Sequence, residues 1–157
     1  MELTSSVFAA GGPIPVRFTC EGEDVSPDFS WGDAPPATES LVLTLRDPDA
    51  PKAGGFTHWL IYGISPRTGR IEQNVPKQPI VEGIGLQGTN DSGEIGYMGP
   101  CPPSGMHRYF ARLFALDLEL KLRPGAFYEE VRAAMDGHIL ARAELMGTYA
   151  KKAERAA

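Results

Sequence analysis

The segments that decide the fold are DPDAP at residues 47–51, GGFTHW at residues 54–59 and GYMGPCPPSGMHRY at residues 96–109. They hold two of the three histidines of the chain together with a dense run of Gly and Pro. Gly and Pro impose unusual backbone paths, and stretches with strand character border these segments. We therefore expect them to form loops that hold side chains around a cavity at the ends of strands.

Three stretches next to these loops predict the central strands of a sheet. Residues 41–45 (LVLTL) are a short apolar run without clean alternation, which is typical of a strand buried on both faces. Residues 57–64 are rich in β-branched and aromatic side chains, and residues 107–117 read as a third strand. Because the connections are too short for regular βαβ crossovers, we expect a mainly antiparallel sheet.

The C-terminal third of the chain has a different pattern. Residues 126–136 follow Pro-Gly with helical spacing, and Gly137 is a suitable stop. The stretch 141–149 is ambiguous, because its residue types favour a helix while its alternation has strand period. We predict a strand there, one domain over residues 1–150, and a disordered tail at residues 151–157.

Composition and charge exclude several classes of protein. The net charge of −5 and the pI of about 5.2 disfavour nucleic-acid binding. No apolar stretch approaches the ~20 residues that a membrane-spanning helix needs, and the N-terminus lacks the features of a signal peptide. We therefore expect a cytoplasmic protein. In that compartment Cys20 and Cys101 are expected as free thiols, and a disulfide between them is the less favoured alternative.

The two histidines next to the loops are the first candidates for a site. On a regular strand His58 shares a face with Leu60 and Tyr62, and His107 shares a face with Tyr109. If the two strands lie side by side, both imidazoles and the Tyr109 hydroxyl surround one hollow. The alternative is two histidines that are satisfied separately.

The two acids that flank Pro48 are the next candidates. Asp and Pro both favour turns, and turn chemistry alone explains one of Asp47 and Asp49. In the alternative, one carboxylate points into the hollow and accepts a hydrogen bond from a histidine, which raises the histidine pKa and selects its tautomer.

The loop of residues 96–105 is the candidate for shaping the cavity. Its backbone N–H groups form a possible anion-binding nest, with Gly99, Cys101, Ser104 and Gly105 as donors. The alternative is a rigid surface loop without a ligand.

Other motifs in the chain carry weaker signals. GIGLQG at residues 83–88 matches the dinucleotide fingerprint, but no helix can start well after it, so we reject that reading. Asp and His residues without a metal-binding spacing do not predict a metal site, and we expect no cofactor. A triad of Ser104, His107 and an Asp lacks a nucleophile elbow. His138 is expected at the surface or at the end of the helix.

Taken together, these motifs resemble the phosphatidylethanolamine-binding protein family, also called Raf kinase inhibitor-like proteins, and most of all its small bacterial and archaeal branch. The resemblance extends over nearly the whole chain, and the order and spacing of its motifs are specific. The motifs are SPDFSW at 26–31, DPDAP at 47–51, THW at 57–59, GTND at 88–91, GYMGPCPP at 96–103, HRY at 107–109, GHILA at 137–141 and GTY at 147–149.

The resemblance implies a mainly β fold of two antiparallel sheets with Greek-key connections and one or two short helices near the C-terminus. It also implies a pocket for phosphate or a phosphorylated head group, and homodimers such as bacterial members form. Carried over residue by residue, the pocket comprises Asp47, Asp49, Pro51, His58, Trp59, Gly99, Pro100, His107 and Tyr109.

Three functions follow in order of preference. The first is a module that binds a phosphorylated or other anionic small ligand, with an affinity that falls as pH rises through the histidine titration. The second is an enzyme, a hydrolase or isomerase that uses His58 and His107 as acid and base. The third is an inhibitor or regulator of a protein kinase or protease, whose partner the sequence does not name. We favour binding over catalysis.

Overall fold

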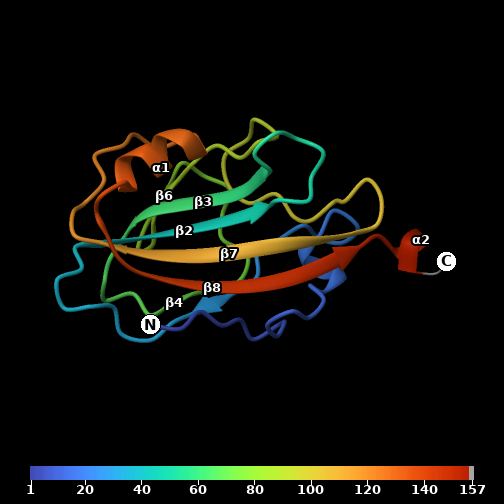
Figure 1. The fold of residues 1–157 in the computed structure, drawn as a ribbon, viewed down its shortest axis with the longest axis horizontal. Helices are drawn as coiled ribbons and strands as arrows, with labels where there is room; N and C mark the ends of the chain where they lie inside the picture. The colour runs from blue at the N-terminus through green and yellow to red at the C-terminus, as the bar shows by residue number, and fades with distance from the viewer. Residues whose placement is uncertain (156–157) are drawn as a thin grey trace.

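The computed structural model describes residues 1–155, which form two antiparallel sheets and three short helical segments (Figure 1). The larger sheet has six strands in the order β5-β6-β3-β2-β7-β8, and the smaller sheet pairs β1 with β4. The strands are β1 (Phe29–Ser30), β2 (Ser40–Asp47), β3 (Phe56–Ile64), β4 (Arg70–Ile71), β5 (Ile80–Val81), β6 (Gly85–Gln87), β7 (Met106–Leu116) and β8 (Ile139–Ala150). The helical segments are η1 (Val16–Phe18), α1 (Tyr128–Met135) and α2 (Lys152–Arg155).

The central strand β2 is buried on both faces, as its unbroken apolar run predicted. Leu41, Leu43 and Leu45 pack into the cluster between the large sheet, the small sheet and the N-terminal segment. Val42 packs into a second cluster on the opposite face, beneath α1. This alternation follows from the period of two along a strand, so β2 carries apolar side chains to two separate cores.

The chain leaves β2 for β3 on one side and returns as β7 on the other side of β2. The predicted fold class, two antiparallel sheets with few helices, is therefore confirmed. None of the helices described in residues 1–155 is long and apolar enough to cross a membrane.

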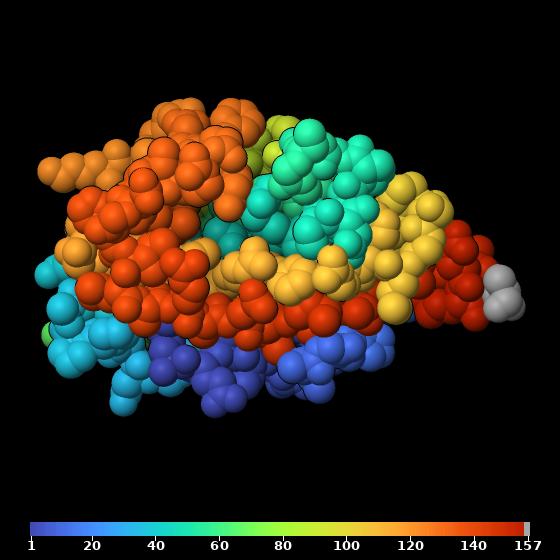
Figure 2. Space-filling view, in the orientation of Figure 1, coloured from blue at the N-terminus to red at the C-terminus, as the bar shows by residue number. Residues whose placement is uncertain are grey.

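Helix α1 covers the second core at one end of the large sheet, in orange in Figures 1 and 2. Its buried residues Val131 and Met135 contact the apolar cluster that includes Leu60 and Phe114. The helix ends before Gly137, whose positive φ of 81° is the left-handed conformation that terminates helices. The helix predicted over residues 126–136 is thus confirmed in a slightly shorter form.

The ambiguous stretch 141–149 is a strand, because it pairs with β7 along almost its whole length. Its outer edge is partly covered by the N-terminal segment, which lies along β8 in Figure 2 and bonds to Met146 and Thr148. After β8, α2 forms one helical turn within the tail that the sequence predicts to be disordered. Residues 156–157 of that tail lie outside the described residues, and the single-domain boundary at residue 150 stays a prediction.

Candidate functional site

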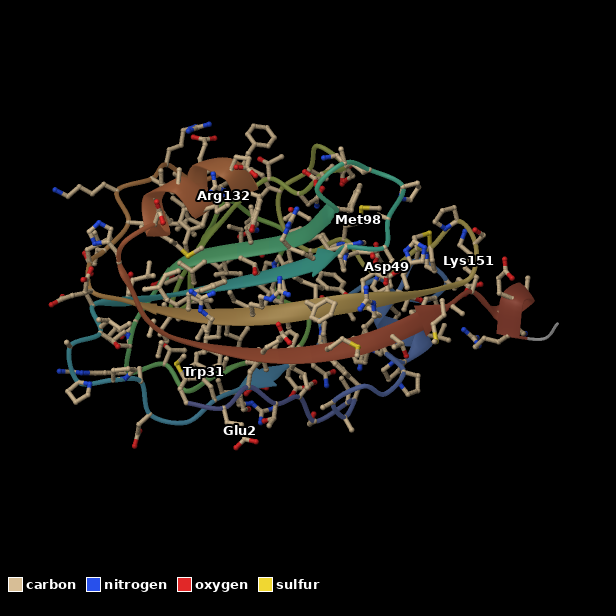
Figure 3. The ribbon with its side chains drawn as sticks, in the orientation of Figure 1. Glu2, Trp31, Asp49, Met98, Arg132 and Lys151 are labelled. Carbon is tan, nitrogen blue, oxygen red and sulfur yellow. A yellow bond between two sulfur atoms is a disulfide. The ribbon has the colours of Figure 1, made fainter. Side chains whose placement is uncertain are left out.

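The candidate site forms at the edge of the large sheet where β2 ends and its two neighbours, β3 and β7, begin. The strands that carry His58 and His107 are not direct neighbours, because β2 lies between them, yet both histidines and Tyr109 line one cavity. The last residue of β2 is Asp47, which pairs with Phe56 of β3. The intervening strand therefore supplies a carboxylate between the two histidine-bearing strands. Met98 and Asp49, labelled in Figure 3, lie near the same end of the sheet.

A β-bulge turns His58 toward the cavity. In the β2–β3 ladder Leu45 pairs with Trp59 and Arg46 with Thr57, so His58 has no partner of its own. At a bulge two residues of one strand face a single residue of the other, and the alternation of side chains is interrupted. The expectation that His58 shares a face with Leu60 and Tyr62 is therefore wrong, because those two side chains pack beneath α1. Instead the His58 ring lies 5.3 Å from the Tyr109 ring, centroid to centroid.

Asp47 and His107 form a buried hydrogen-bonded pair. The Nδ1–H of His107 donates to the Oδ2 atom of Asp47 over 2.6 Å, and the Asp47 side chain is only 3% exposed. The other carboxylate oxygen, Oδ1, accepts the backbone N–H of Asp49 over 2.7 Å. Both oxygens of Asp47 are thus engaged, and of the two alternatives left open by the sequence, the structure shows the one in which a carboxylate binds a histidine.

His58 is held by the backbone of the loop between β6 and β7. Its Nδ1–H donates to the carbonyl oxygen of Met98 over 2.7 Å, because a carbonyl can only accept. Burial lowers the pKa of His58 below its ordinary value, against the opposing effects of the Met98 carbonyl and the Asp47 carboxylate. The neutral ring therefore carries its proton on Nδ1 and its lone pair on Nε2, which bonds to no described residue.

Tyr109 contributes a hydroxyl that has no hydrogen-bond partner among the described residues. The side chain is 1% exposed, and burial raises its pKa far above the ordinary range, so the hydroxyl keeps its proton. A buried donor without a partner costs roughly 1–3 kcal/mol.

These groups line a cavity of about 440 Å³, within the size range of small-molecule sites. Five of its lining residues were predicted, and they are Asp47, Pro51, His58, His107 and Tyr109. Seven more were not in the set that the family resemblance implied, although Cys101 was expected as a backbone donor of the loop 96–105. They are Ala50, Lys52, Phe56, Met98, Cys101, Pro102 and Pro103. All of the latter fall within or directly beside the three Gly- and Pro-rich segments, so their position in the sequence was the available signal.

Four predicted site residues do not line the cavity: Asp49, Trp59, Gly99 and Pro100. The carboxylate of Asp49 instead binds the guanidinium and the backbone N–H of Arg108. This guanidinium lowers the pKa of Asp49 to about 2. Trp59 is a core residue that packs against Tyr97 and donates its indole N–H to Gln87 over 2.7 Å. It supports the site from within the core and forms none of its wall.

Gly99 and Pro100 attach the cavity loop to the N-terminal segment. The N–H of Gly99 donates to the Oδ1 atom of Asp24 over 2.7 Å, so it is not a free donor for an anion nest as predicted. A Cβ atom at this position would collide with the Asp24 carboxylate and the Phe18 carbonyl. The carbonyl of Pro100 accepts the N–H of Cys20 over 3.1 Å.

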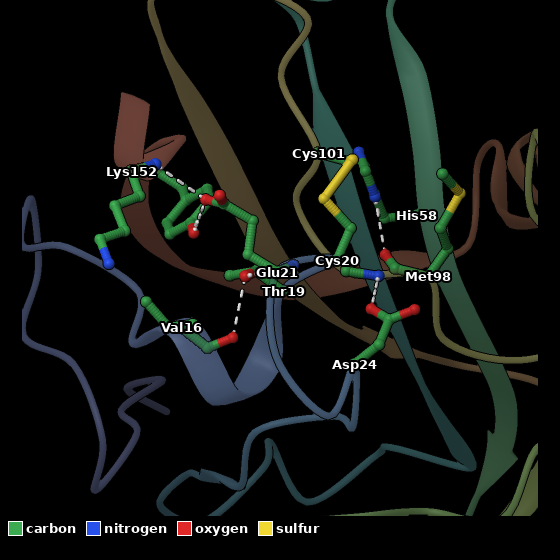
Figure 4. The surroundings of a disulfide bond; sticks show 11 residues. Val16, Thr19, Cys20, Glu21, Asp24, His58, Met98, Cys101 and Lys152 are labelled. Atoms are coloured by element: carbon green, nitrogen blue, oxygen red, sulfur yellow. Dashed lines mark hydrogen bonds between the residues drawn. A yellow bond between two sulfur atoms is a disulfide. The ribbon is translucent and has the colours of Figure 1, made fainter. Parts of the chain in front are cut away.

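The same attachment is reinforced by a disulfide between Cys20 and Cys101 (Figure 4). The expectation of two free thiols is therefore wrong. The hydrogen bond from Cys20 to Pro100 places the two cysteines next to one another, and their Cα atoms are 5.4 Å apart, within the range that a disulfide spans. Because Cys101 lines the cavity and Met98 receives the His58 hydrogen bond, the disulfide anchors the loop that builds one wall of the site.

The model of one protein family, described as phosphatidylethanolamine-binding protein, matches residues 4–150. The chain belongs to this family. Among its relatives, a UPF0098 protein of Methanothermobacter thermautotrophicus is 50% identical over 149 residues, covering 95% of this chain and 98% of the relative. A UPF0098 protein of Aquifex aeolicus is 49% identical and covers 95% of this chain and 88% of the relative.

Two solved structures have the same fold. A Chlamydia trachomatis protein described as a phosphatidylethanolamine-binding protein homologue superposes with a TM-score of 0.88 at 42% identity, covering 96% of this chain and 97% of that chain. Escherichia coli YbcL, described as a new member of the mammalian family, has a TM-score of 0.85 at 26% identity and covers 96% of this chain and 98% of its own.

Proposed function

We propose that this family member binds a small phosphorylated or otherwise anionic ligand in the cavity beside Asp47, His58, His107 and Tyr109. The observation that carries the proposal is the unpartnered Tyr109 hydroxyl, which is buried and protonated on a side chain that lines the cavity. A buried donor of this kind is rare in proteins, and an anionic oxygen is its natural acceptor.

The two histidines support the same proposal in different ways. His107 donates its Nδ1–H to the Asp47 carboxylate, which fixes the tautomer and the orientation of its ring. Burial disfavours the cationic form of His58, so its free Nε2 accepts a hydrogen bond from a protonated ligand oxygen or from water. A phosphate monoester titrates with a pKa of about 6, so we expect binding near neutral pH to be coupled to protonation and to weaken as pH rises.

Calorimetric titration of inorganic phosphate and phosphoethanolamine at about pH 6.5 tests the proposal. We expect the wild-type protein to bind and His107→Ala to lose binding while it stays folded by circular dichroism. Since His107→Ala also removes a partner from the buried Asp47, Tyr109→Phe serves as a second variant that deletes a single oxygen. Wild-type protein that binds neither probe would contradict the proposal.

The cytoplasmic location also belongs to the proposal, and the disulfide sets a condition on it. Disulfides are uncommon in the reducing cytosol, although those of hyperthermophiles are an exception. We therefore expect the Cys20–Cys101 bond to resist a reduced glutathione buffer. Thiol alkylation and mass spectrometry measure how fast the bond is reduced in that buffer. Rapid reduction would argue for an oxidising compartment.

A further inference from the structure

The cavity has one lysine on its wall, and its present partner holds it only weakly. Among the lining residues that the structure describes, Lys52 is the single Lys or Arg side chain. Its Nζ atom lies 3.5 Å from the Oδ2 atom of Asp91, beyond the 2.7–2.9 Å that is usual for a charge-assisted bond. That oxygen already accepts the N–H of Thr57 over 2.7 Å. The ammonium of Lys52 therefore shares an occupied acceptor.

The backbone of Lys52 is held by hydrogen bonds, while its side chain is half exposed. The N–H of Lys52 donates to the Ala50 carbonyl over 2.7 Å, and its own carbonyl accepts the N–H of Gly55 over 2.9 Å. Gly55 has a φ of 85° and lies so close to Asp47 that a Cβ atom would approach the Asp47 carbonyl to 2.9 Å. This tight turn holds the Lys52 Cα beside the site. The Lys52 side chain is 50% exposed, and ion pairs this exposed cost little to exchange.

The other ionisable groups around the cavity do not supply a positive charge that is available to a ligand throughout the neutral pH range. His58 is surrounded by the carboxylates of Asp47 on β2, Asp24 in the N-terminal segment and Asp91 after β6, and by Tyr109 on β7, but its burial opposes protonation. His107 is bound to Asp47. The guanidinium of Arg108 is occupied by Asp49 and does not reach the wall. A lysine ammonium, in contrast, keeps its positive charge throughout the neutral range.

We propose that Lys52 is the mobile cation of this site, which exchanges Asp91 for the anionic group of a ligand in the cavity. This inference rests on the proposed function and adds the group that recognises charge when the histidines are neutral. It predicts a cavity that retains affinity for a doubly charged phosphate monoester above the histidine titration.

The test is calorimetry with phosphoethanolamine at about pH 6 and about pH 8, because a histidine of ordinary pKa is charged at the first value and neutral at the second. We expect Lys52→Gln to bind about tenfold more weakly than wild type at the higher pH, the size of one lost charge-assisted bond, and to lose less at the lower pH. Lys52→Arg keeps the charge and should retain most of the affinity. Lys121→Gln removes an equal charge from an exposed position at the opposite end of β7 and should bind like wild type.

The outcomes separate this inference from the proposed function. If Tyr109→Phe weakens binding while Lys52→Gln matches Lys121→Gln at both pH values, the cavity binds the anion and Lys52 has no part in it. If wild type binds neither phosphoethanolamine nor inorganic phosphate at either pH, both proposals are overturned. A loss confined to Lys52→Gln at the higher pH, with recovery in Lys52→Arg, supports the exchange.

Discussion

The two ends of the large sheet are built from the same strands but differ in the side chains buried there. Under α1, the strands end in side chains that need no polar partner, and Leu60, Val131 and Leu116 are completely buried. At the cavity end, buried polar groups replace them, among them Asp47, His58 and His107. The first end is closed by packing, and the second is kept open by Pro-rich loops and a covalent bond. The difference shows that the two ends of the sheet are stabilised by different means.

The cavity end is expected to depend most on its disulfide. The bond joins residues 81 positions apart, and closing a loop of that length stabilises a protein by about 4 kcal/mol in the chain-entropy model. We expect the double variant Cys20→Ser, Cys101→Ser to lose that much unfolding free energy in urea and to bind phosphate more weakly, because the loop carrying Met98 is released. Wild type treated with a strong reductant should behave in the same way, whereas the variant should not respond to the reductant. Equal stability of oxidised and reduced wild type would break this part of the comparison.

The α1 end is expected to depend mainly on apolar packing. Met135 is 3% exposed, and Met135→Ala leaves a cavity that should lower the unfolding free energy by about 2–3 kcal/mol. The variant Leu140→Ala, at a position that is 41% exposed, is the control and should cost far less. Neither variant should change phosphate affinity, measured by calorimetry under conditions where both are folded. A reduced affinity in Met135→Ala would show that the two ends are coupled.

A matched pair of Tyr→Phe variants contrasts the two ends most directly. The Tyr62 hydroxyl, on the α1 side, donates to the Arg123 carbonyl and accepts the N–H of Ala126. Its removal in Tyr62→Phe should cost about 1 kcal/mol of stability and leave binding unchanged. Tyr109→Phe deletes an unpartnered hydroxyl, so stability should stay equal or rise by up to ~1 kcal/mol while phosphate affinity falls. A destabilised Tyr109→Phe with normal affinity would show that this hydroxyl serves the fold.

The smallest expected effect is the pH dependence that His58 gives to stability. Burial lowers the pKa of His58 in the folded protein, so the unfolded chain binds more protons just below the ordinary value of about 6.5. The unfolding free energy should therefore increase with pH up to that value and decrease on acidification. Urea titrations at several pH values should show this slope in wild type and a shallower slope in His58→Gln. The exposed His138 provides the control, and His138→Gln should retain the contribution of His58.

Most of the fold was predictable because local patterns and tertiary contacts agree. The apolar run at residues 41–45 predicted a doubly buried strand, and β2 has a core on each face. The stretch at 141–149 was decided correctly by its alternation, which pairing with β7 enforces against its helical propensity. The two-sheet architecture was predicted from the family resemblance, because the spacing of apolar residues alone does not specify it.

The candidate site was predictable as a set of segments but not as a set of contacts. Asp47, Pro51, His58, His107 and Tyr109 line the cavity, as the motifs implied. Trp59 does not, although it is adjacent to His58, because the bulge directs one side chain to the cavity and the next into the core. A bulge depends on the register between two strands, and one strand read alone does not reveal it.

The sequence by itself determined the central strands β2, β3 and β7, the strand β8 and a helix before Gly137. It also determined that acids, histidines and Gly-Pro loops lie at the ends of strands. The periodicity of apolar residues and the backbone preferences of Gly and Pro act over a few residues, so they can be recognised in the sequence. Only the tertiary structure decided that β2 separates the two histidine strands, that Asp47 binds His107, that Cys20 joins Cys101, and that Lys52 stands at the cavity wall. Each of these depends on groups far apart in sequence, whose approach is set by strand order and register.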